Sequence, residues 1–109
     1  MTTVAFTMEG SRITGFTSTG HSGYADEGED IVCAAISSVI GFTECAINEV
    51  LGLAASVKID PDRAKISLHL PGGLSEEIDD ICQTLMQTLM VYLVELRDEY
   101  PDHINVLEV

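Results

Sequence analysis

The chain has 109 residues, of which 46% are hydrophobic, and this size and composition predict one folded domain spanning residues 1–109. Its 18 acidic residues against five lysines and arginines give a formal net charge of −13. Such a surface repels phosphate backbones, so we expect no direct nucleic-acid binding, whereas a basic partner would be attracted. We expect no signal peptide and no apolar run long enough to cross a membrane.

The three cysteines have no regular spacing along the chain. An odd, irregular set argues against a disulfide framework and for a reducing compartment, so we expect a cytoplasmic protein. No CxxC or HxxxH pair occurs, and the sequence therefore predicts no metal site and no cofactor. His69 and His103 stand in strand-like surroundings and are interpreted as structural or exposed residues.

The first segment is predicted to be a β-hairpin. Apolar residues alternate with small polar ones at the period of a half-buried strand, at Val4, Phe6 and Met8. Residues 9–11 form the turn, and residues 12–19 resume the alternation with Ile13 and Gly15 on one face and Phe16 on the other. Gly15 in mid-strand indicates either the close approach of a neighbour or ligand, or a bulge.

A glycine-rich loop is predicted from Gly20 to Glu29, followed by a helix from about Ile31 to Leu53. We interpret Asp30 as the helix N-cap; the alternative is that it orients His21. Cys33 then falls at the third helical position, where unpaired N–H groups and the helix dipole favour a thiolate. A nearby imidazole such as that of His21 would activate the thiol further, as cysteine nucleophilic catalysis requires. The alternative is that Cys33 is a small buried residue and His21 an exposed one.

This predicted helix is apolar on nearly every side. At about 100° per residue its polar positions form one narrow stripe, made of Asp30, Ser37, Glu44 and Asn48. Cys33 lies at the edge of this stripe, which favours the catalytic interpretation, whereas Cys45 is expected in the core. A helix that is apolar all round must pack against neighbours on two sides. One is the sheet, and the other is the second helix, a partner subunit, or both.

The rest of the chain predicts a second hairpin, a second helix and a last strand. Residues 56–60 form a strand with Val57 and Ile59 inward, residues 60–63 a turn, and residues 64–70 the returning strand. Ser75 is a good N-cap for an amphipathic helix that ends at Pro101. The core stripe of that helix contains Cys82. Residues 104–108 alternate as a final strand.

The predicted order of elements is ββαββαβ. Five strands in this order can form one largely antiparallel sheet, with two long helices covering one face. The fold class is therefore α+β, a two-layer sandwich.

The residues around Cys33 also form a recognisable motif. It consists of Gly20-His21, a short loop, and then Gly28-x-Asp30-Ile31-Val32-Cys33-Ala34-Ala35-Ile36-Ser37. This motif resembles the signature of the ribosomal-processing cysteine protease Prp family, and the length and order of elements fit as well. The resemblance implies a catalytic dyad of His21 and Cys33. It also implies that Gly20, Asp30 and Ser37 support the site or bind substrate.

The resemblance further implies a function. Members of this family remove a short N-terminal extension from a large-subunit ribosomal protein, cutting after an aromatic residue and before a small one. We therefore expect a cytoplasmic, homodimeric cysteine endopeptidase whose substrate is that N-terminal peptide. Two alternatives stay open: a non-catalytic peptide-binding module associated with ribosome assembly, and a cysteine acyl-transfer enzyme, such as a thioesterase, that acts on a small molecule.

Overall fold

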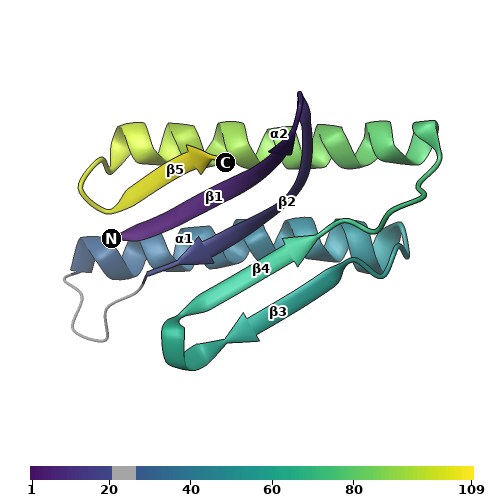
Figure 1. The fold of residues 1–109 in the computed structure, drawn as a ribbon. Coiled ribbons are helices and arrows are strands. Elements are labelled where there is room, and N and C mark those ends of the chain that lie inside the picture. Colours follow the sequence, from purple (N-terminus) through teal and green to yellow (C-terminus); the bar gives the residue numbers. More distant parts are fainter. Residues whose placement is uncertain (21–26) are drawn as a thin grey trace.

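The protein has two layers, a β-sheet and a pair of helices that both lie on one face of it (Figure 1). The structure is a computed structural model that describes residues 1–20 and 27–109, without the side chains of residues 27–30. The strands are β1 (Thr2–Glu9), β2 (Arg12–Thr19), β3 (Ser56–Asp60), β4 (Lys65–His69) and β5 (Ile104–Glu108). Helix α1 (Glu27–Glu44) is continued by the π-helical η1 (Cys45–Val50). The other helices are the short 3₁₀ turn η2 (Pro61–Arg63), between β3 and β4, and α2 (Glu76–Glu99).

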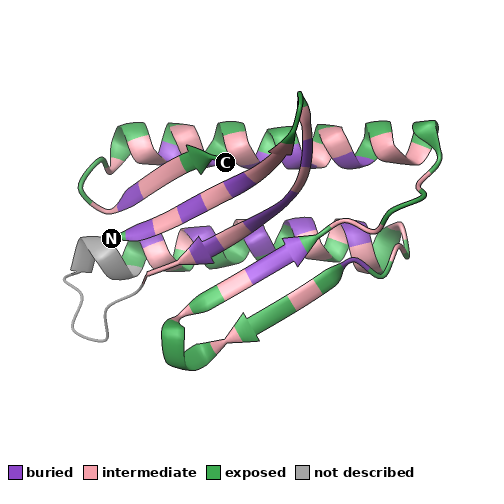
Figure 2. Ribbon diagram, viewed as in Figure 1, coloured by how far each residue is buried: buried purple, intermediate pink, exposed green. Residues whose placement is uncertain are grey.

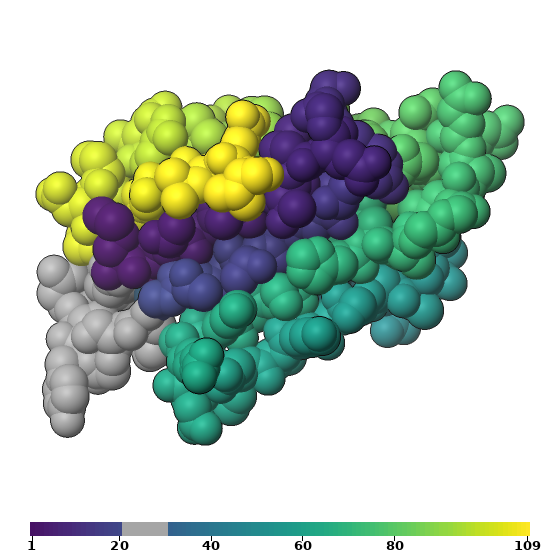
Figure 3. Space-filling model, in the orientation of Figure 1, coloured from purple at the N-terminus to yellow at the C-terminus, as the bar shows by residue number. Residues whose placement is uncertain are grey.

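The five strands are arranged in the order β3-β4-β2-β1-β5. Within the described residues every pairing is antiparallel except that of β1 with β5, which is parallel. Figure 3 shows the same order on the surface, with the yellow C-terminal strand beside the purple N-terminal one. The predicted α+β sandwich with the order ββαββαβ is confirmed.

The first hairpin carries the centre of the core. Val4 and Phe6 are fully buried as predicted, and Phe6 pairs across the strands with Phe16 at a ring-centroid distance of 6.0 Å. The prediction that Ile13 and Phe16 lie on opposite faces is wrong, because both are buried. The register shifts after Thr7, which leaves an extra residue in β2 and reverses the alternation there.

Gly15 sits next to this bulge, and both interpretations of it are correct. A Cβ at Gly15 would collide with the backbone oxygen of Leu68 in the neighbouring strand β4. The side-chain amide of Gln83 on α2 pairs with the backbone of Ile13 at this irregularity. It donates to the Ile13 carbonyl at 2.8 Å and accepts from the Ile13 N–H at 2.7 Å. The bulge therefore leaves the backbone of Ile13 paired.

The start of α1 differs from the prediction. The helix begins at Glu27, so Asp30 lies inside its first turn rather than at the N-cap, and Cys33 lies in the second turn. The interpretation of Asp30 as the cap took Gly28 for part of the loop. A glycine this close to a helix end is tolerated, and the acidic residue types at 27, 29 and 30 suit a first turn.

The other end of this helix widens before it stops. Leu51 N–H bonds to the Ala46 carbonyl at 3.0 Å, a π-type hydrogen bond, and the helical residues end at Val50 rather than at the predicted Leu53. Gly52 then adopts a left-handed φ of 67°, and the Leu53 N–H returns to the Ile47 carbonyl at 3.1 Å. A glycine is the residue that ends a helix this way at little cost.

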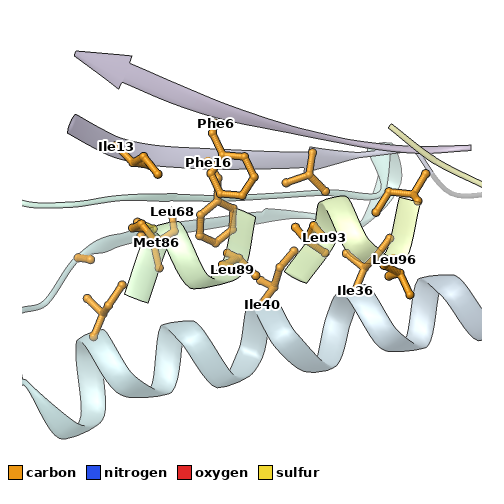
Figure 4. Close-up of a cluster of buried hydrophobic side chains, with 14 of the residues drawn as sticks. Phe6, Ile13, Phe16, Ile36, Ile40, Leu68, Met86, Leu89, Leu93 and Leu96 are labelled. Carbon is orange, nitrogen blue, oxygen red and sulfur yellow. The ribbon is translucent and has the colours of Figure 1, made fainter. Parts of the chain in front are cut away.

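Both helices bury one stripe against the sheet (Figures 2 and 4). The buried residues of α1 and η1 are Val32, Ile36, Ile40, Thr43 and Ile47. Those of α2 are Cys82, Met86, Leu89, Leu93 and Leu96, so the prediction that Cys82 belongs to the core is confirmed. Ser75 caps α2 as predicted, since its hydroxyl accepts from the Ile78 N–H at 3.2 Å.

Two apolar residues predicted to be buried are exposed. Cys45 is exposed because it lies about 180° around the helix from the centre of the buried stripe at 100° per residue. Ile59 is 70% exposed although its strand position faces the helix layer. It stands on the edge strand β3, over a cleft, where no helix covers it.

The expectation that no apolar run reaches membrane-spanning length is also wrong. Ile31–Val50 is a helical stretch of 20 residues with a mean hydropathy of 1.7. Length and hydropathy of this kind occur in membrane spans and in core helices alike. Here the stretch packs its buried stripe into the core beneath the sheet.

A bidentate ion pair fastens β2 to the start of α2. Arg12 donates from Nε and from a terminal guanidinium nitrogen to the two carboxylate oxygens of Asp79, at 2.9 and 2.8 Å. These hydrogen bonds lower the pKa of Asp79, while burial opposes them, and the same bonds raise the pKa of Arg12. A carboxyl group with a lowered pKa stabilises the fold while it is ionised.

Asp79→Asn should lower the free energy of unfolding at pH 7 by about 1 kcal/mol or less, because the pair is partly solvated. The contribution of Asp79 is fully present above its unfolded pKa of about 3.9 and disappears as the pH falls through its lower folded value. The difference between parent and variant should therefore shrink below about pH 4. Urea unfolding of parent and variant at several pH values measures this difference in the free energy of unfolding.

Asp80→Asn is the matched control, since it removes the same charge from the same turn of α2. A parent–variant difference for Asp79→Asn that stays constant down to the lowest pH would contradict the role of the ion pair.

Candidate active site

A cleft of about 450 Å³ opens between the first helix, the end of β2 and the β3–β4 hairpin. This volume is in the range of about 300–1,000 Å³ that small-molecule and cofactor sites occupy. The cleft is lined by Thr2, Ser18, Gly20, Cys33, Ala34, Ile36, Ser37, Ile59, Asp60, Pro61, Ala64, Lys65 and Ile66.

Three of the five predicted site residues line this cleft: Gly20, Cys33 and Ser37. Cys33 is half-buried and Ser37, one turn further along α1, is exposed. His21 lies outside the described residues, directly after Gly20 in the sequence. Asp30 is described only by its backbone, which places it one turn before Cys33 in α1. The roles predicted for these residues stay predictions.

The corrected helix start changes how the thiol can be activated. The N–H groups left unpaired at a helix start are those of its first four residues, here residues 27–30. The N–H of Cys33 is in the second turn and is committed to the helix, and the effect of the helix dipole falls off within the first turn. Activation of Cys33 therefore depends more on neighbouring side chains than the sequence predicted.

Gly20 has a conformation and surroundings that require glycine. Its φ is +93°, and a Cβ there would collide with the carbonyl oxygen of Met1. The chain leaves β2 at this point and turns toward the segment that contains His21. The first residue of the Gly-His pair in the motif is therefore glycine for a steric reason.

Thr2 is a site residue that the sequence analysis missed. Its hydroxyl donates to the Gly20 carbonyl at 2.9 Å and lies 3.7 Å from Cys33 Sγ. The side chain is only 4% exposed. The signal was present in the sequence, since the alternation that puts Val4 and Phe6 inward also puts a polar Thr2 inward.

The three cysteines occupy three different environments. Cys33 lines the cleft, Cys45 is exposed on the outside of the helix, and Cys82 is fully buried. Burial raises the pKa of the Cys82 thiol, and the nearby Asp79 charge raises it further. Cys82 is thus an internal reference for an inaccessible thiol, and Cys45 is one for an exposed thiol.

If Cys33 is an activated nucleophile, iodoacetamide at neutral pH should modify it in the native protein faster than Cys45. Cys82 should react last, because it is buried and its pKa is raised. Peptide mapping by mass spectrometry at successive times gives the three rates. Equal rates at Cys33 and Cys45 would remove the basis for an activated thiol.

A half-buried thiol at the edge of a cleft, on a helix that packs against a sheet, is accessible to a substrate, as a cysteine nucleophile must be. Residues 1–105 match the family described as cysteine protease Prp, and the chain belongs to this family. It is a cysteine protease, and the family resemblance predicted from the motif is confirmed.

Known relatives agree in sequence and in fold. The ribosomal processing cysteine protease Prp of Bacillus subtilis is 28% identical over 94 residues, which cover 86% of this chain and 84% of the relative. A crystal structure of the ribosomal processing protease Prp from S. aureus with a substrate peptide has a TM-score of 0.85 at 24% identity, with full coverage of both chains. A second structure of that protease, with a covalently linked product peptide, has a TM-score of 0.80.

Proposed function

We propose that this protease removes the N-terminal extension of a large-subunit ribosomal protein during bacterial ribosome maturation. Membership of the cysteine protease Prp family supports this proposal, as do the relatives named ribosomal processing proteases. The observation that carries it is the cleft in which Gly20, Cys33 and Ser37 of the family motif meet. The cut is expected after an aromatic residue and before a small one.

The proposed mechanism uses Cys33 as the nucleophile and His21 as the general base. The sulfur attacks the scissile carbonyl carbon while His21 takes the thiol proton, and the developing oxyanion is stabilised by hydrogen-bond donors. His21 then gives the proton to the leaving amine, which releases the new N-terminus of the ribosomal protein. Water hydrolyses the acyl-enzyme and frees the extension.

The walls of the cleft suit an extended peptide. Apolar side chains from both layers, Ile36, Ile59 and Ile66, line it together with the charged Asp60 and Lys65. Ile59, which is 70% exposed on the edge strand β3, gives the cleft an apolar wall that a bound peptide can contact. The net charge of −13 additionally favours encounter with a basic ribosomal protein.

The native protein should trim a ribosomal protein that carries its N-terminal extension at one bond, and Cys33→Ala should not. Intact-mass spectrometry of the product reads both the cleavage and the position of the bond. Cys45→Ala is the matched control, because it removes an exposed cysteine from the same helical stretch and should leave the rate unchanged. Trimming by Cys33→Ala at the parent rate would refute the proposed nucleophile.

The two alternatives predict different results, one in this experiment and one in a comparison of thioester with peptide substrates. A non-catalytic binding module would hold the extended ribosomal protein without cutting it, in parent and Cys33→Ala alike. An acyl-transfer enzyme for small molecules would hydrolyse thioesters faster than peptides. The exposed apolar wall of the cleft and the family both favour the peptide.

We also propose that the protein is a cytoplasmic homodimer. The described cysteines form no disulfide, in keeping with a reducing compartment. The outer face of the helical stretch leaves large apolar residues uncovered: Ile31 is 52% exposed, Phe42 76% and Val50 78%. Ile31 and Phe42 share one face, about three turns apart. A second copy of the chain that packs against this outer face would bury these apolar side chains.

Phe42→Glu should convert the dimer into a monomer, since it places a charge in the middle of this apolar face. Light scattering at micromolar concentration measures the mass of parent and variant. Val91→Glu is the control, because it makes the same change at an apolar residue that is 55% exposed on α2. A parent protein that is monomeric under these conditions would contradict the homodimer.

A further inference from the structure

The hydroxyl of Thr2 lies between the carbonyl of Gly20 and the sulfur of Cys33. Its proton is donated to the Gly20 carbonyl at 2.9 Å, and Cys33 Sγ is 3.7 Å from the same Oγ1. A hydroxyl has one proton and two acceptor lone pairs. With the proton directed at Gly20, Oγ1 accepts from the S–H of Cys33 as long as the thiol is neutral.

The position of this hydroxyl is fixed by the fold. Thr2 is 4% exposed, its N–H donates to the His103 carbonyl at 3.0 Å, and it pairs with Ile104 of β5. The β-branched side chain has few rotamers in a strand. A buried hydroxyl has to be hydrogen-bonded, and here the Gly20 carbonyl and Cys33 Sγ are the two groups within reach of it.

The loss of the thiol proton changes what the sulfur requires. A thiolate can only accept, and a hydrogen bond to an ionised group is stronger than one between neutral groups. Rotation about one bond redirects the Thr2 O–H from the Gly20 carbonyl to the sulfur. The same side chain therefore accepts from the thiol and donates to the thiolate without any movement of its oxygen.

We propose that Thr2 is a positioning residue for the protease reaction, whose hydroxyl holds the Cys33 sulfur at the cleft and donates to it when it ionises. The inference rests on the proposed role of Cys33 as nucleophile. It also means that the Gly20 carbonyl loses the Thr2 hydrogen bond when the sulfur ionises. Gly20 directly precedes His21 in the sequence.

The test compares Thr2→Val, which removes the hydroxyl at constant volume, with Thr2→Ser, which keeps it. For each protein the rate of Cys33 alkylation by iodoacetamide is measured against pH, together with kcat and KM for cleavage of the extended ribosomal protein. A hydrogen bond to an ionised group corresponds to a factor of about 10 or more. Thr2→Val should therefore shift the alkylation profile about one pH unit upward and lower kcat about tenfold, with KM less affected.

Thr2→Ser should retain the parent alkylation profile. The matched control is Thr43→Val, which removes another buried hydroxyl that bonds to a backbone carbonyl, that of Val39 at 2.8 Å, away from the cleft. Its alkylation profile should stay at that of the parent, and thermal melting of all variants separates a loss of folding from a loss of function.

Two outcomes would overturn the role of Thr2. One is a Thr2→Val protein that alkylates and cleaves like the parent, and the other is an equal loss in Thr2→Ser and Thr2→Val, which would assign the effect to packing. Failure of the proposed function looks different, because the parent would then not trim the extended ribosomal protein, while the alkylation profiles of Thr2→Val and Thr2→Ser would still report on Cys33.

Discussion

The rotation of α1 about its own axis is the constraint on which the site depends. Val32 and Ile36 are 0% and 3% exposed, and their burial beneath the sheet fixes which side of the helix faces inward. Cys33 follows Val32 by about 100°, so the same burial holds its sulfur at the border between core and cleft. Burying each large aliphatic side chain contributes about 1.5–3 kcal/mol. A rotation of α1 that buried the sulfur or exposed it fully would also expose these side chains, and would therefore cost free energy of folding.

The cleft exists because the two layers do not match in width. Helix α2 contacts β2 and β5, while the β3–β4 hairpin extends past α1 at the end where η2 connects its strands (Figure 1). Ile59 of this hairpin thus faces helix residues across an open space, while Ile66 both lines the cleft and packs against the core. The arrangement leaves Cys33 with apolar walls on one side and the end of β2 on the other, a setting that suits a reaction on an extended chain.

The sequence predicted the order of the elements, the sheet with helices on one face, and the group of Gly20, Cys33 and Ser37, because these follow from alternation, helical period and a specific motif. It could not predict features set by contacts between distant segments. The bulge in β2 lies beside Gly15, where β4 passes too close for a side chain, and it reverses the faces of the preceding residues. The start of α1 lies earlier than predicted because an aspartate suits the first turn of a helix as well as its N-cap, so Asp30 alone does not fix where the helix begins. Thr2 was missed because its partners, Gly20 and Cys33, are brought to it only by the sheet.

The parallel pairing of β1 with β5 has a consequence for when Thr2 gains its backbone partners. Thr2 is held by His103 and Ile104, which are separated from it by almost the whole sequence. During synthesis, the helix with Cys33 and the hairpin that walls the cleft emerge well before β5 does. Thr2, beside Cys33, acquires its backbone partner only when that last strand has been made and has joined the sheet. The order of translation thus makes the pairing of β1 with β5, and with it the backbone support of Thr2 in the cleft, a late step in folding.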